Sequence, residues 1–373
     1  MNVAIVNTAK HSSFQKYVPL ALLKLSTKHK IQNDRVIYLT KGQIPKKKVD
    51  IFYFSTIFPF DFKNDVSIIS AYAKRYQSSK IHIGGPSISI IPDKFEYFLK
   101  KNKNVEFKTG LYNELDSYEP DYNICNVEFS YGFTSRGCIN KCPWCIVPKV
   151  EGDLRVVRDW RKAIDVKRKI FKGMDNNILA CDTGHIEEVF DYINRFDIKV
   201  DFNQGMDCEK LMTSENVKKL FIKYKNIWNK IRFAWDSKRV DKYALESLKF
   251  LSKNKIKCED MVWYMLYDDK DSPEIVFNRM KSLIFNPYRD CKIKLMRFKD
   301  FKTGGLPRNW GDTGDKWAYW MGMNMTALVS RSTLDKWVLE KDYLTFQKRL
   351  AILTKTAKNK KSMQYLRKHL NEY

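Results

Sequence analysis

The chain has few cysteines for its length, and they do not suit a secreted disulfide scaffold. There are eight in 373 residues, and only three of them lie close together. Small secreted domains carry many cysteines in a compact framework of pairs. This scarcity excludes a disulfide scaffold, and in a reducing compartment a cluster of thiols indicates metal binding or catalysis.

Long apolar runs are also absent. No stretch approaches the roughly 18 apolar residues that a membrane helix needs. The opening MNVAIVNTAK has no basic leader before its short apolar run, so it does not resemble a signal peptide. We therefore expect a cytoplasmic protein with no membrane partner. Its 44% hydrophobic content is enough for globular packing.

Acidic residues are too few to balance the basic ones. The chain has 68 Lys and Arg against 43 Asp and Glu, a formal net charge of +25. Such an excess favours contact with nucleic acid or other anionic partners. The chain is also rich in Lys, Asn and Ile and poor in Gly and Pro, a bias that an AT-rich genome produces without any such function. Both explanations stay open.

The first hundred residues alternate short β-branched runs with helical periodicity. Strands are predicted at 3–6, 36–39, 51–54, 81–83 and 105–107. Between the third and the fourth, Val66, Ile69 and Ala73 recur at helical spacing. Apolar strands separated by helices predict a doubly wound parallel sheet at 1–120. The polar segment at 110–123 is the predicted linker.

A second α/β domain is predicted at 125–300. It starts with a strand at 127–133 and an amphipathic helix at 159–171. Five further strands are predicted at 177–182, 198–203, 231–236, 261–267 and 292–298. Six βα units are fewer than the eight of a closed barrel, so the prediction is a partial (β/α)6 TIM-type barrel. An aromatic-rich segment and basic helices at 301–373 form a small α-helical C-terminal extension.

Polar residues follow several of these predicted strands. Asp182 ends the second strand of this domain, Asn203 and Gln204 end the third, and Asp236 ends the fourth. Active sites of parallel α/β domains lie at the carboxyl ends of the strands. The four residues are therefore site candidates, and the alternative for each is a helix cap or a turn.

The cysteine cluster lies in TSRGCINKCPWCIVPKVEG, residues 134–152. Cys138, Cys142 and Cys145 have the spacing C-x3-C-x2-C. A structural zinc site and a plain electron-transfer cluster both take four protein ligands, and the fourth would have to be the distant Cys125 or Cys181. Three close thiolates instead suit a cubane cluster with one iron open to a non-protein ligand.

This motif, placed just after the first strand of a six-unit βα domain, resembles the radical SAM superfamily. The resemblance implies that Cys138, Cys142 and Cys145 bind a 4Fe–4S cluster whose fourth iron binds S-adenosylmethionine (SAM). An electron from a donor such as a flavodoxin or a ferredoxin would then release a 5′-deoxyadenosyl radical. The substrate is unidentified, and the positive charge favours a nucleotide, RNA or DNA.

The same resemblance suggests further cofactor contacts. Trp144 would lie near the adenine, and Asp182 is the nearest match to the acidic residue that holds the SAM amine. Asn203, Gln204 and Asp236 are candidates for the SAM ribose and carboxylate or for the substrate. No catalytic residue is assigned.

The N-terminal domain resembles the cobalamin-binding-like domain of a radical SAM subgroup. The segment IHIGGPSIS, residues 81–89, matches the Gly-Gly-Pro turn of that subgroup. The Asp-x-His-x-x-Gly signature of cobalamin binding is missing, since the corresponding segment reads NTAKHSSFQKY. A cobalamin-dependent radical SAM methyltransferase is therefore one alternative. Another, of a different class, is a non-catalytic nucleic-acid-binding protein stabilised by a metal.

Overall fold

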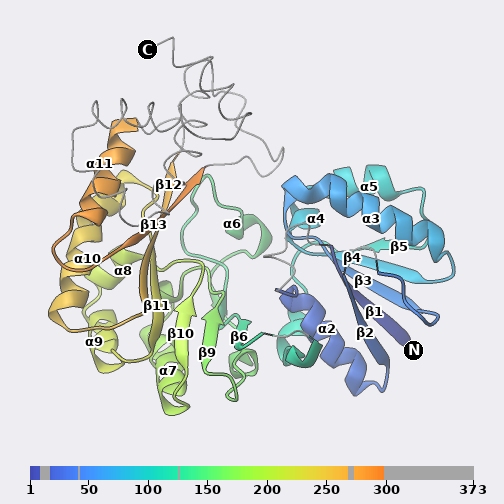
Figure 1. Ribbon diagram of the computed structural model, residues 1–373, viewed down its shortest axis with the longest axis horizontal. Coiled ribbons are helices and arrows are strands. Elements are labelled where there is room, and N and C mark those ends of the chain that lie inside the picture. The colour runs from blue at the N-terminus through green and yellow to red at the C-terminus, as the bar shows by residue number, and fades with distance from the viewer. Residues whose placement is uncertain (9–16, 41–42, 125–126, 268–272, 298–373) are drawn as a thin grey trace, which may run out of the picture. The chain divides into compact units, whose positions relative to one another are not determined.

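The computed structural model describes residues 1–8, 17–40, 43–124, 127–267 and 273–297. These residues form an α/β protein with two parallel sheets, one of five strands and one of six (Figure 1). The chain divides into two compact units, and the division falls between Gln204 and Gly205. No helix in the described ranges has the length and apolar character to cross a bilayer.

The first sheet has the strand order β2-β1-β3-β4-β5. Its strands are β1 (Asn2–Asn7), β2 (Arg35–Thr40), β3 (Ile51–Ser55), β4 (Lys80–Gly84) and β5 (Val105–Phe107). All neighbouring pairs are parallel. The five strands confirm the prediction, and the order reverses between β1 and β3, where ligands bind in doubly wound sheets.

Helices cover both faces of this sheet because its strands are apolar on both sides. Ala4 and Val6 face a core shared with α3 and α5, while Ile5 faces the core of α2. The helices are α2 (Leu20–Ile31), α3 (Phe62–Arg75), α4 (Pro86–Ile90) and α5 (Pro92–Leu99). Three 3-10 turns lie at Pro59–Asp61, Asn113–Ser117 and Tyr122–Ile124.

The second sheet has the order β13-β12-β11-β10-β9-β6. Its strands are β6 (Phe129–Gly132), β9 (Ile170–Gly173), β10 (Lys199–Phe202), β11 (Trp228–Ala234), β12 (Asp260–Tyr267) and β13 (Lys292–Arg297). Its strands lie side by side in chain order, apart from the short antiparallel pair β7 (Ser135–Arg136) and β8 (Arg155–Val156). Among the described residues the sheet forms no closed barrel.

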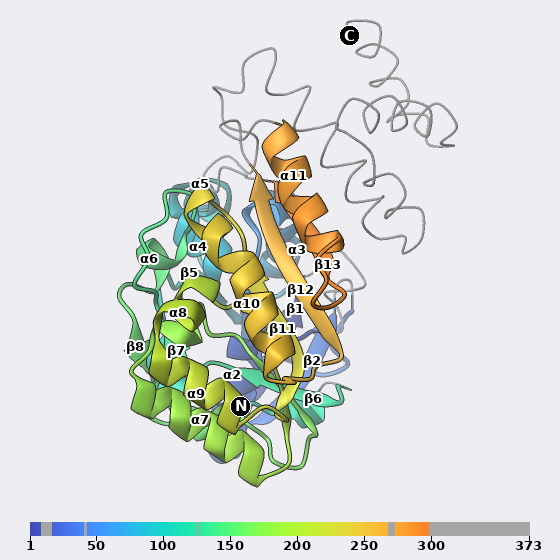
Figure 2. The ribbon, with the colours of Figure 1, turned by 90° about the vertical axis from the view of Figure 1, so that its left-hand side faces the viewer.

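Helices connect these parallel strands, as such crossovers require. They are α6 (Val147–Val150), α7 (Thr183–Arg195), α8 (Cys208–Thr213), α9 (Glu215–Lys223), α10 (Asp241–Lys253) and α11 (Pro273–Ile284). Three 3-10 turns lie at Trp160–Ala163, Ile178–Ala180 and Lys238–Val240. Figure 2 shows α10 and α11 alongside one another, with α11 beside β13.

Two predicted elements of this region are wrong. The predicted helix at 159–171 is a 3-10 turn followed by a polar turn, and its last residues start β9. The predicted strand at 177–182 is the 3-10 turn Ile178–Ala180. Trp160 and Ala163 are buried by tertiary packing, which imitates helical periodicity. The apolar run of the turn is equally buried, so composition does not distinguish it from a strand.

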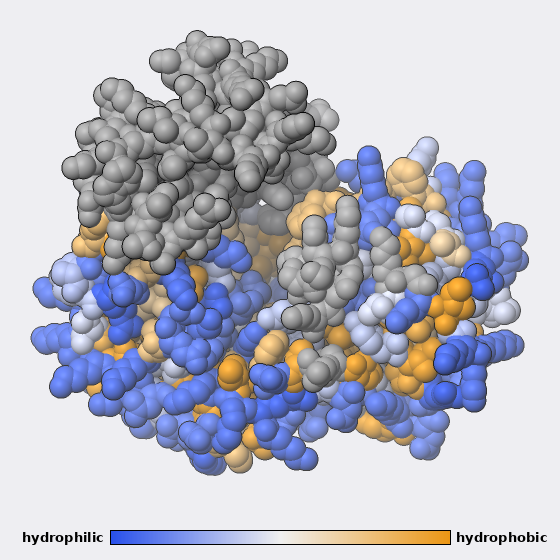
Figure 3. Space-filling view, viewed as in Figure 1, coloured by the Kyte–Doolittle hydropathy of each residue, from blue (hydrophilic) through white to orange (hydrophobic). Residues whose placement is uncertain are grey.

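The aromatic-rich segment and the basic helices predicted at 301–373 lie outside the described residues. On the face in Figure 3 the described surface is largely hydrophilic, and apolar residues appear as small separate areas. Scattered exposed apolar residues of this kind are ordinary for a protein surface.

Candidate metal centre

The three cysteines lie on a loop that leaves the second sheet directly after β6. We call residues 137–154 the cysteine loop and the strands β7 and β8 its neck. Ser135 pairs with Val156 and Arg136 with Arg155 across the neck. The Cys138 amide donates to the Gly152 carbonyl at 3.4 Å. The two ends of the loop are therefore joined just before the first cysteine.

Glycine is required where the neck meets the loop. Gly137 has φ +75°, and a Cβ there would collide with the Asp153 backbone carbonyl. Only a residue without a side chain lets the two arms approach this closely. The Gly before the first cysteine of the motif thus has a structural cause.

Cys138, Cys142 and Cys145 are partly exposed. The Asn140 amide donates to Cys138 Sγ at 3.4 Å, and the Cys145 amide donates to the Cys142 carbonyl at 3.0 Å. Soft thiolates that accept amide hydrogen bonds are the donors of iron–sulfur clusters. The chemistry of this donor set fits such a cluster.

The side chains do not yet converge. Across the part of the chain that the structure describes, no three His, Cys, Asp or Glu side chains are arranged to hold a metal ion. A bound cluster would require these side chains to turn toward one another. The structure thus shows three thiols on a supported loop but no closed metal site among the described residues.

The buried carboxylate of Asp175 supports the residues where the neck begins. Asp175 Oδ1 accepts hydrogen bonds from the amides and the hydroxyls of both Thr134 and Ser135. The Thr134 amide lies at 3.0 Å and its hydroxyl at 2.6 Å. Asp175 is 1% exposed, and burial raises its pKa although these bonds oppose the shift. The end of β9 is thereby fixed to the start of the cysteine motif.

Two neighbouring groups extend this buried polar cluster. His185 Nε2 lies 3.3 Å from Thr134 Oγ1, and burial lowers the pKa of His185. Burial also raises the pKa of Cys181 to about 11, although a hydrogen bond with Ser135 opposes the shift. Both side chains are therefore neutral near pH 7, and Asp175 is the acidic group of the cluster.

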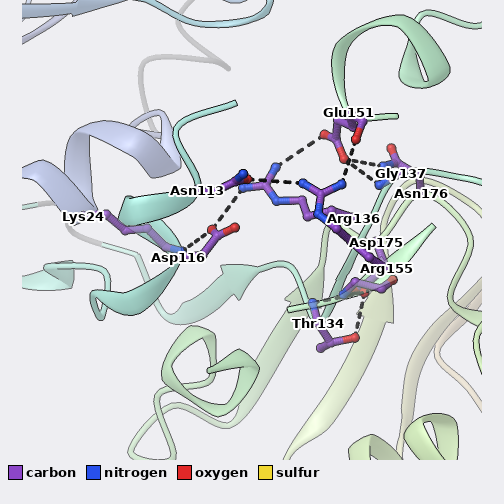
Figure 4. A network of polar contacts seen from close by, with 11 residues as sticks. Lys24, Asn113, Asp116, Thr134, Arg136, Gly137, Glu151, Arg155, Asp175 and Asn176 are labelled. Atoms are coloured by element: carbon purple, nitrogen blue, oxygen red, sulfur yellow. Dashed lines mark hydrogen bonds and ion pairs between the residues drawn. The ribbon is translucent and has the colours of Figure 1, made fainter. Parts of the chain in front are cut away.

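A second carboxylate, Glu151, holds the neck from the side of the loop (Figure 4). Its Oε2 accepts from the Gly137 amide at 3.0 Å and from Asn176 Nδ2 at 2.9 Å. Its Oε1 accepts from Arg136 Nη1 at 3.4 Å. Arg155 donates to the Glu151 carbonyl at 2.7 Å. One carboxylate thus contacts the neck and the segment after β9.

The ion pairs continue from Arg136 to residues of the N-terminal region. Arg136 Nη2 donates to Asp116 Oδ1 at 3.3 Å, and Lys24 Nζ donates to the same oxygen at 2.9 Å. Burial lowers the pKa of Lys24. Although burial acts to raise the pKa of Asp116, the charges of Arg136 and Lys24 lower it overall. Lys24, Asp116, Arg136 and Glu151 therefore form one alternating row of charges.

A cavity of about 360 Å³ lies along this row. Its walls come from the ends of β3 and β4, from α2 between Leu20 and Lys28, and from Phe133 and Met174. Gly85, also in the wall, has φ +108°, and a Cβ there would collide with the Thr56 backbone. The Gly-Gly-Pro turn of the sequence thus lets the backbone pack closely at the edge of the cavity.

The remaining predicted site residues take several different positions. Asn203 and Gln204 are exposed and follow the carboxyl end of β10, as predicted. Asp236 follows β11 and accepts from the Leu266 amide at 3.2 Å, and burial raises its pKa to about 6. Trp144 is half-buried in the cysteine loop. Nothing in the structure assigns any of these a ligand.

The placement of Asp182 at a strand end is wrong. It follows the turn Ile178–Ala180 and is the N-cap of α7, where its side chain accepts from the Gly184 amide at 2.8 Å. The helix-cap alternative therefore describes its local role. The acidic residue that follows the second strand of this sheet is Asp175.

Sequence reasoning missed Asp175, Glu151 and Arg136. A correct position for β9 would have pointed to Asp175, since it comes two residues after that strand ends. Glu151 and Arg136 lie within the cysteine-containing segment, but no spacing rule marks them.

No model of a known protein family and no curated protein matches the chain.

Proposed function

We propose that the chain is a radical SAM enzyme. The observation that carries this proposal is the placement of the motif. C-x3-C-x2-C lies on a loop that leaves the end of the first strand of a six-stranded parallel sheet, and a two-stranded neck closes it. The ends of parallel strands are where such sheets place their chemistry.

In this proposal Cys138, Cys142 and Cys145 would hold a 4Fe–4S cluster, with SAM as its non-protein ligand. Such a cluster would supply the one electron that splits the SAM sulfonium into methionine and a 5′-deoxyadenosyl radical. The protein contributes the support of the loop: Asp175 holds the start of the motif, and Glu151 holds its neck.

Two buried acceptors after β9 support a SAM site beside the loop. Asp175 Oδ2 and Asn177 Oδ1 are buried, and no donor among the described residues reaches them. Buried acceptors normally have a partner, and an ammonium group is a donor that suits a carboxylate and an amide oxygen. We therefore propose Asp175 and Asn177, rather than the helix cap Asp182, as acceptors for the SAM amine; because both oxygens are closed off from solvent here, SAM would reach them only if these side chains turned outward.

The finer architecture is part of the same proposal. The five-stranded domain is proposed to be cobalamin-binding-like, and the open six-stranded sheet to be a partial (β/α)6 TIM-type barrel. The domain limits at 1–120 and 125–300 stay predictions. The reaction also needs a one-electron donor, for which a flavodoxin or a ferredoxin is proposed. An anionic or nucleic-acid substrate stays the expectation from the charge of +25.

One observation favours a second candidate, a cobalamin-dependent radical SAM methyltransferase. The cavity at the ends of β3 and β4 borders Arg136 and Glu151 of the cysteine-loop support. A cofactor in that cavity would lie beside the proposed cluster. Protein expressed in the presence of cobalamin should then show corrinoid absorption. If that protein shows no corrinoid absorption, this candidate is ruled out.

The proposal is tested by anaerobic reconstitution with iron and sulfide, followed by dithionite and SAM. We expect 5′-deoxyadenosine from the wild type and none from Cys142→Ala. The control is Cys208→Ala, which changes a buried cysteine of α8 and should leave the product unchanged. Equal product from wild type and Cys142→Ala would refute the proposal. A wild type that makes no product but binds nucleic acid with a steep salt dependence would favour the non-catalytic alternative.

A further inference from the structure

The side chain of Glu151 joins three segments that would otherwise be independent. Its carboxylate contacts the Gly137 amide in the first arm of the cysteine loop and Asn176 in the segment after β9. Its own backbone belongs to the second arm, directly after α6. A single carboxylate thus sets the separation of the two arms at the point where the loop begins.

Arg136 restrains the other oxygen of this carboxylate. The side chains of Arg136 and Glu151 are only 14% and 12% exposed, so water does little to screen their attraction. Arg136 also lies over the Phe133 ring, 3.5 Å from its centroid, and its other end is bound to Asp116. A guanidinium held by Phe133 and Asp116 offers Glu151 one orientation.

The Gly137 amide is the link to the thiols. It precedes Cys138 directly, and the Cys138 amide is itself bound to the Gly152 carbonyl across the neck. Releasing Glu151 would leave the Gly137 amide without its acceptor and Arg136 Nη1 without its carboxylate, so the contact between the arms would loosen. Cys138 would then lose part of the support that fixes its place in the loop.

We propose that Glu151, oriented by Arg136, is the positioning residue that fixes the two arms of the cysteine loop beside Cys138, so that the three thiols can converge on a metal. This inference rests on the proposed function in that the loop binds a metal centre through its thiols. It adds an acidic residue outside the C-x3-C-x2-C motif to that centre. Glu151 is not a ligand in this account; it acts through the Gly137 amide.

The test measures thiolate convergence without iron, sulfide or SAM. Apo protein is titrated with Co²⁺ and followed by the sulfur-to-cobalt charge-transfer absorption. Outer residues that orient ligands change metal affinity by about tenfold or more, so we expect Glu151→Ala to weaken Co²⁺ binding by that factor. Glu151→Gln keeps an oxygen for the Gly137 amide and should restore most of the affinity.

Asp153→Ala is the matched control. It removes the same charge from the same loop, but Asp153 is exposed, and it should bind Co²⁺ like the wild type. Alkylation of the apo protein by iodoacetamide, followed by mass spectrometry, gives an independent measure. Iodoacetamide should alkylate Cys138 faster in Glu151→Ala than in Asp153→Ala. The alkylation rate of the buried Cys208 should be the same in both variants if the fold is intact.

Glu151→Asp keeps the proposal open to refutation if the alanine variant does not fold. The shorter side chain retains the charge but cannot reach both the Gly137 amide and Asn176, so Co²⁺ binding should weaken. The role of Glu151 would be overturned if Glu151→Ala had the same Co²⁺ affinity and the same Cys138 alkylation rate as Asp153→Ala. If Glu151→Ala does not fold, the same comparison is made between Glu151→Asp and Asp153→Ala. Absence of 5′-deoxyadenosine from the wild type, with the Glu151 effects intact, would instead overturn the proposed reaction alone.

Discussion

At the scale of single residues, the two glycines of the cysteine loop provide a matched comparison. Gly137 and Gly152 have φ of +75° and +77°, but a Cβ on Gly137 collides with the Asp153 carbonyl while a Cβ on Gly152 meets open space. The backbone cost is therefore the same, and the difference is steric. Comparing alanine variants at these two positions therefore separates the steric cost of the close approach of the two arms from the cost of the backbone conformation.

We predict that Gly137→Ala costs more stability than Gly152→Ala. The left-handed backbone costs each variant about 1–2 kcal/mol, and the collision adds about 2 kcal/mol or more at Gly137. Urea unfolding of both variants measures the difference. Equal free energies of unfolding would mean that the neck is not as tightly closed as described.

Asp65 gives a pH-dependent prediction. It is buried in the first turn of α3, and burial raises its pKa from the ordinary 3.8 to about 7, against hydrogen bonds from Thr8 and Asn64. Because the folded pKa is raised, the stability due to the neutral acid is fully present below pH 3.8 and is lost as the pH rises through about 7.

We therefore predict that Asp65→Asn gains stability relative to wild type as the pH rises from 4 to 8. The amide stays neutral throughout, and a shift of this size corresponds to about 4 kcal/mol at most. Chemical denaturation at the two pH values measures the change. A wild-type-to-variant difference that does not vary with pH would show that the Asp65 carboxyl titrates normally.

At the scale of elements, α7 begins at a side-chain cap. Asp182 accepts from the Gly184 amide, which accounts for an acidic residue at this position without a cofactor. We predict that Asp182→Ala lowers the free energy of unfolding by about 1 kcal/mol and that Asp182→Asn, which can still cap, does not. SAM affinity, measured by equilibrium dialysis on the reconstituted protein, should be the same in both variants. A loss of SAM binding in Asp182→Asn would return Asp182 to the cofactor site.

The elements also show how far sequence patterns reach. All five strands of the first sheet were predictable because most of their residues are apolar, and many of these are β-branched or aromatic. The strand β9 was not, since Ile170–Gly173 contains only two apolar side chains and the buried Trp160 just before it imitates a helix. Because the sequence pattern places the second strand at 177–182 instead of 170–173, it points to Asp182 and not to Asp175.

The candidate site divides in the same way. The three cysteines follow from spacing alone, because their chemistry needs nothing else from the sequence. The row from Lys24 to Glu151 does not, because it joins side chains up to 127 positions apart through tertiary packing. Long-range ion pairs of this kind carry no periodic signal in one sequence.

At the scale of the whole molecule, we propose that the cysteine loop holds a 4Fe–4S cluster with one iron open to SAM. The excess of basic residues bears only on what the substrate could be, and the cavity only on whether a second cofactor binds. Neither alters the claim about the loop. That claim depends on three thiols and on the absence of a fourth protein ligand.

The most direct test is electron paramagnetic resonance of the reconstituted, reduced protein before and after SAM is added. The account predicts the signal of a single reduced 4Fe–4S cluster, with g-values that shift on SAM addition because SAM binds the open iron. Cys142→Ala should lose the signal. A spectrum that SAM leaves unchanged, or a cluster shown to have a fourth cysteine ligand such as Cys181, would contradict it.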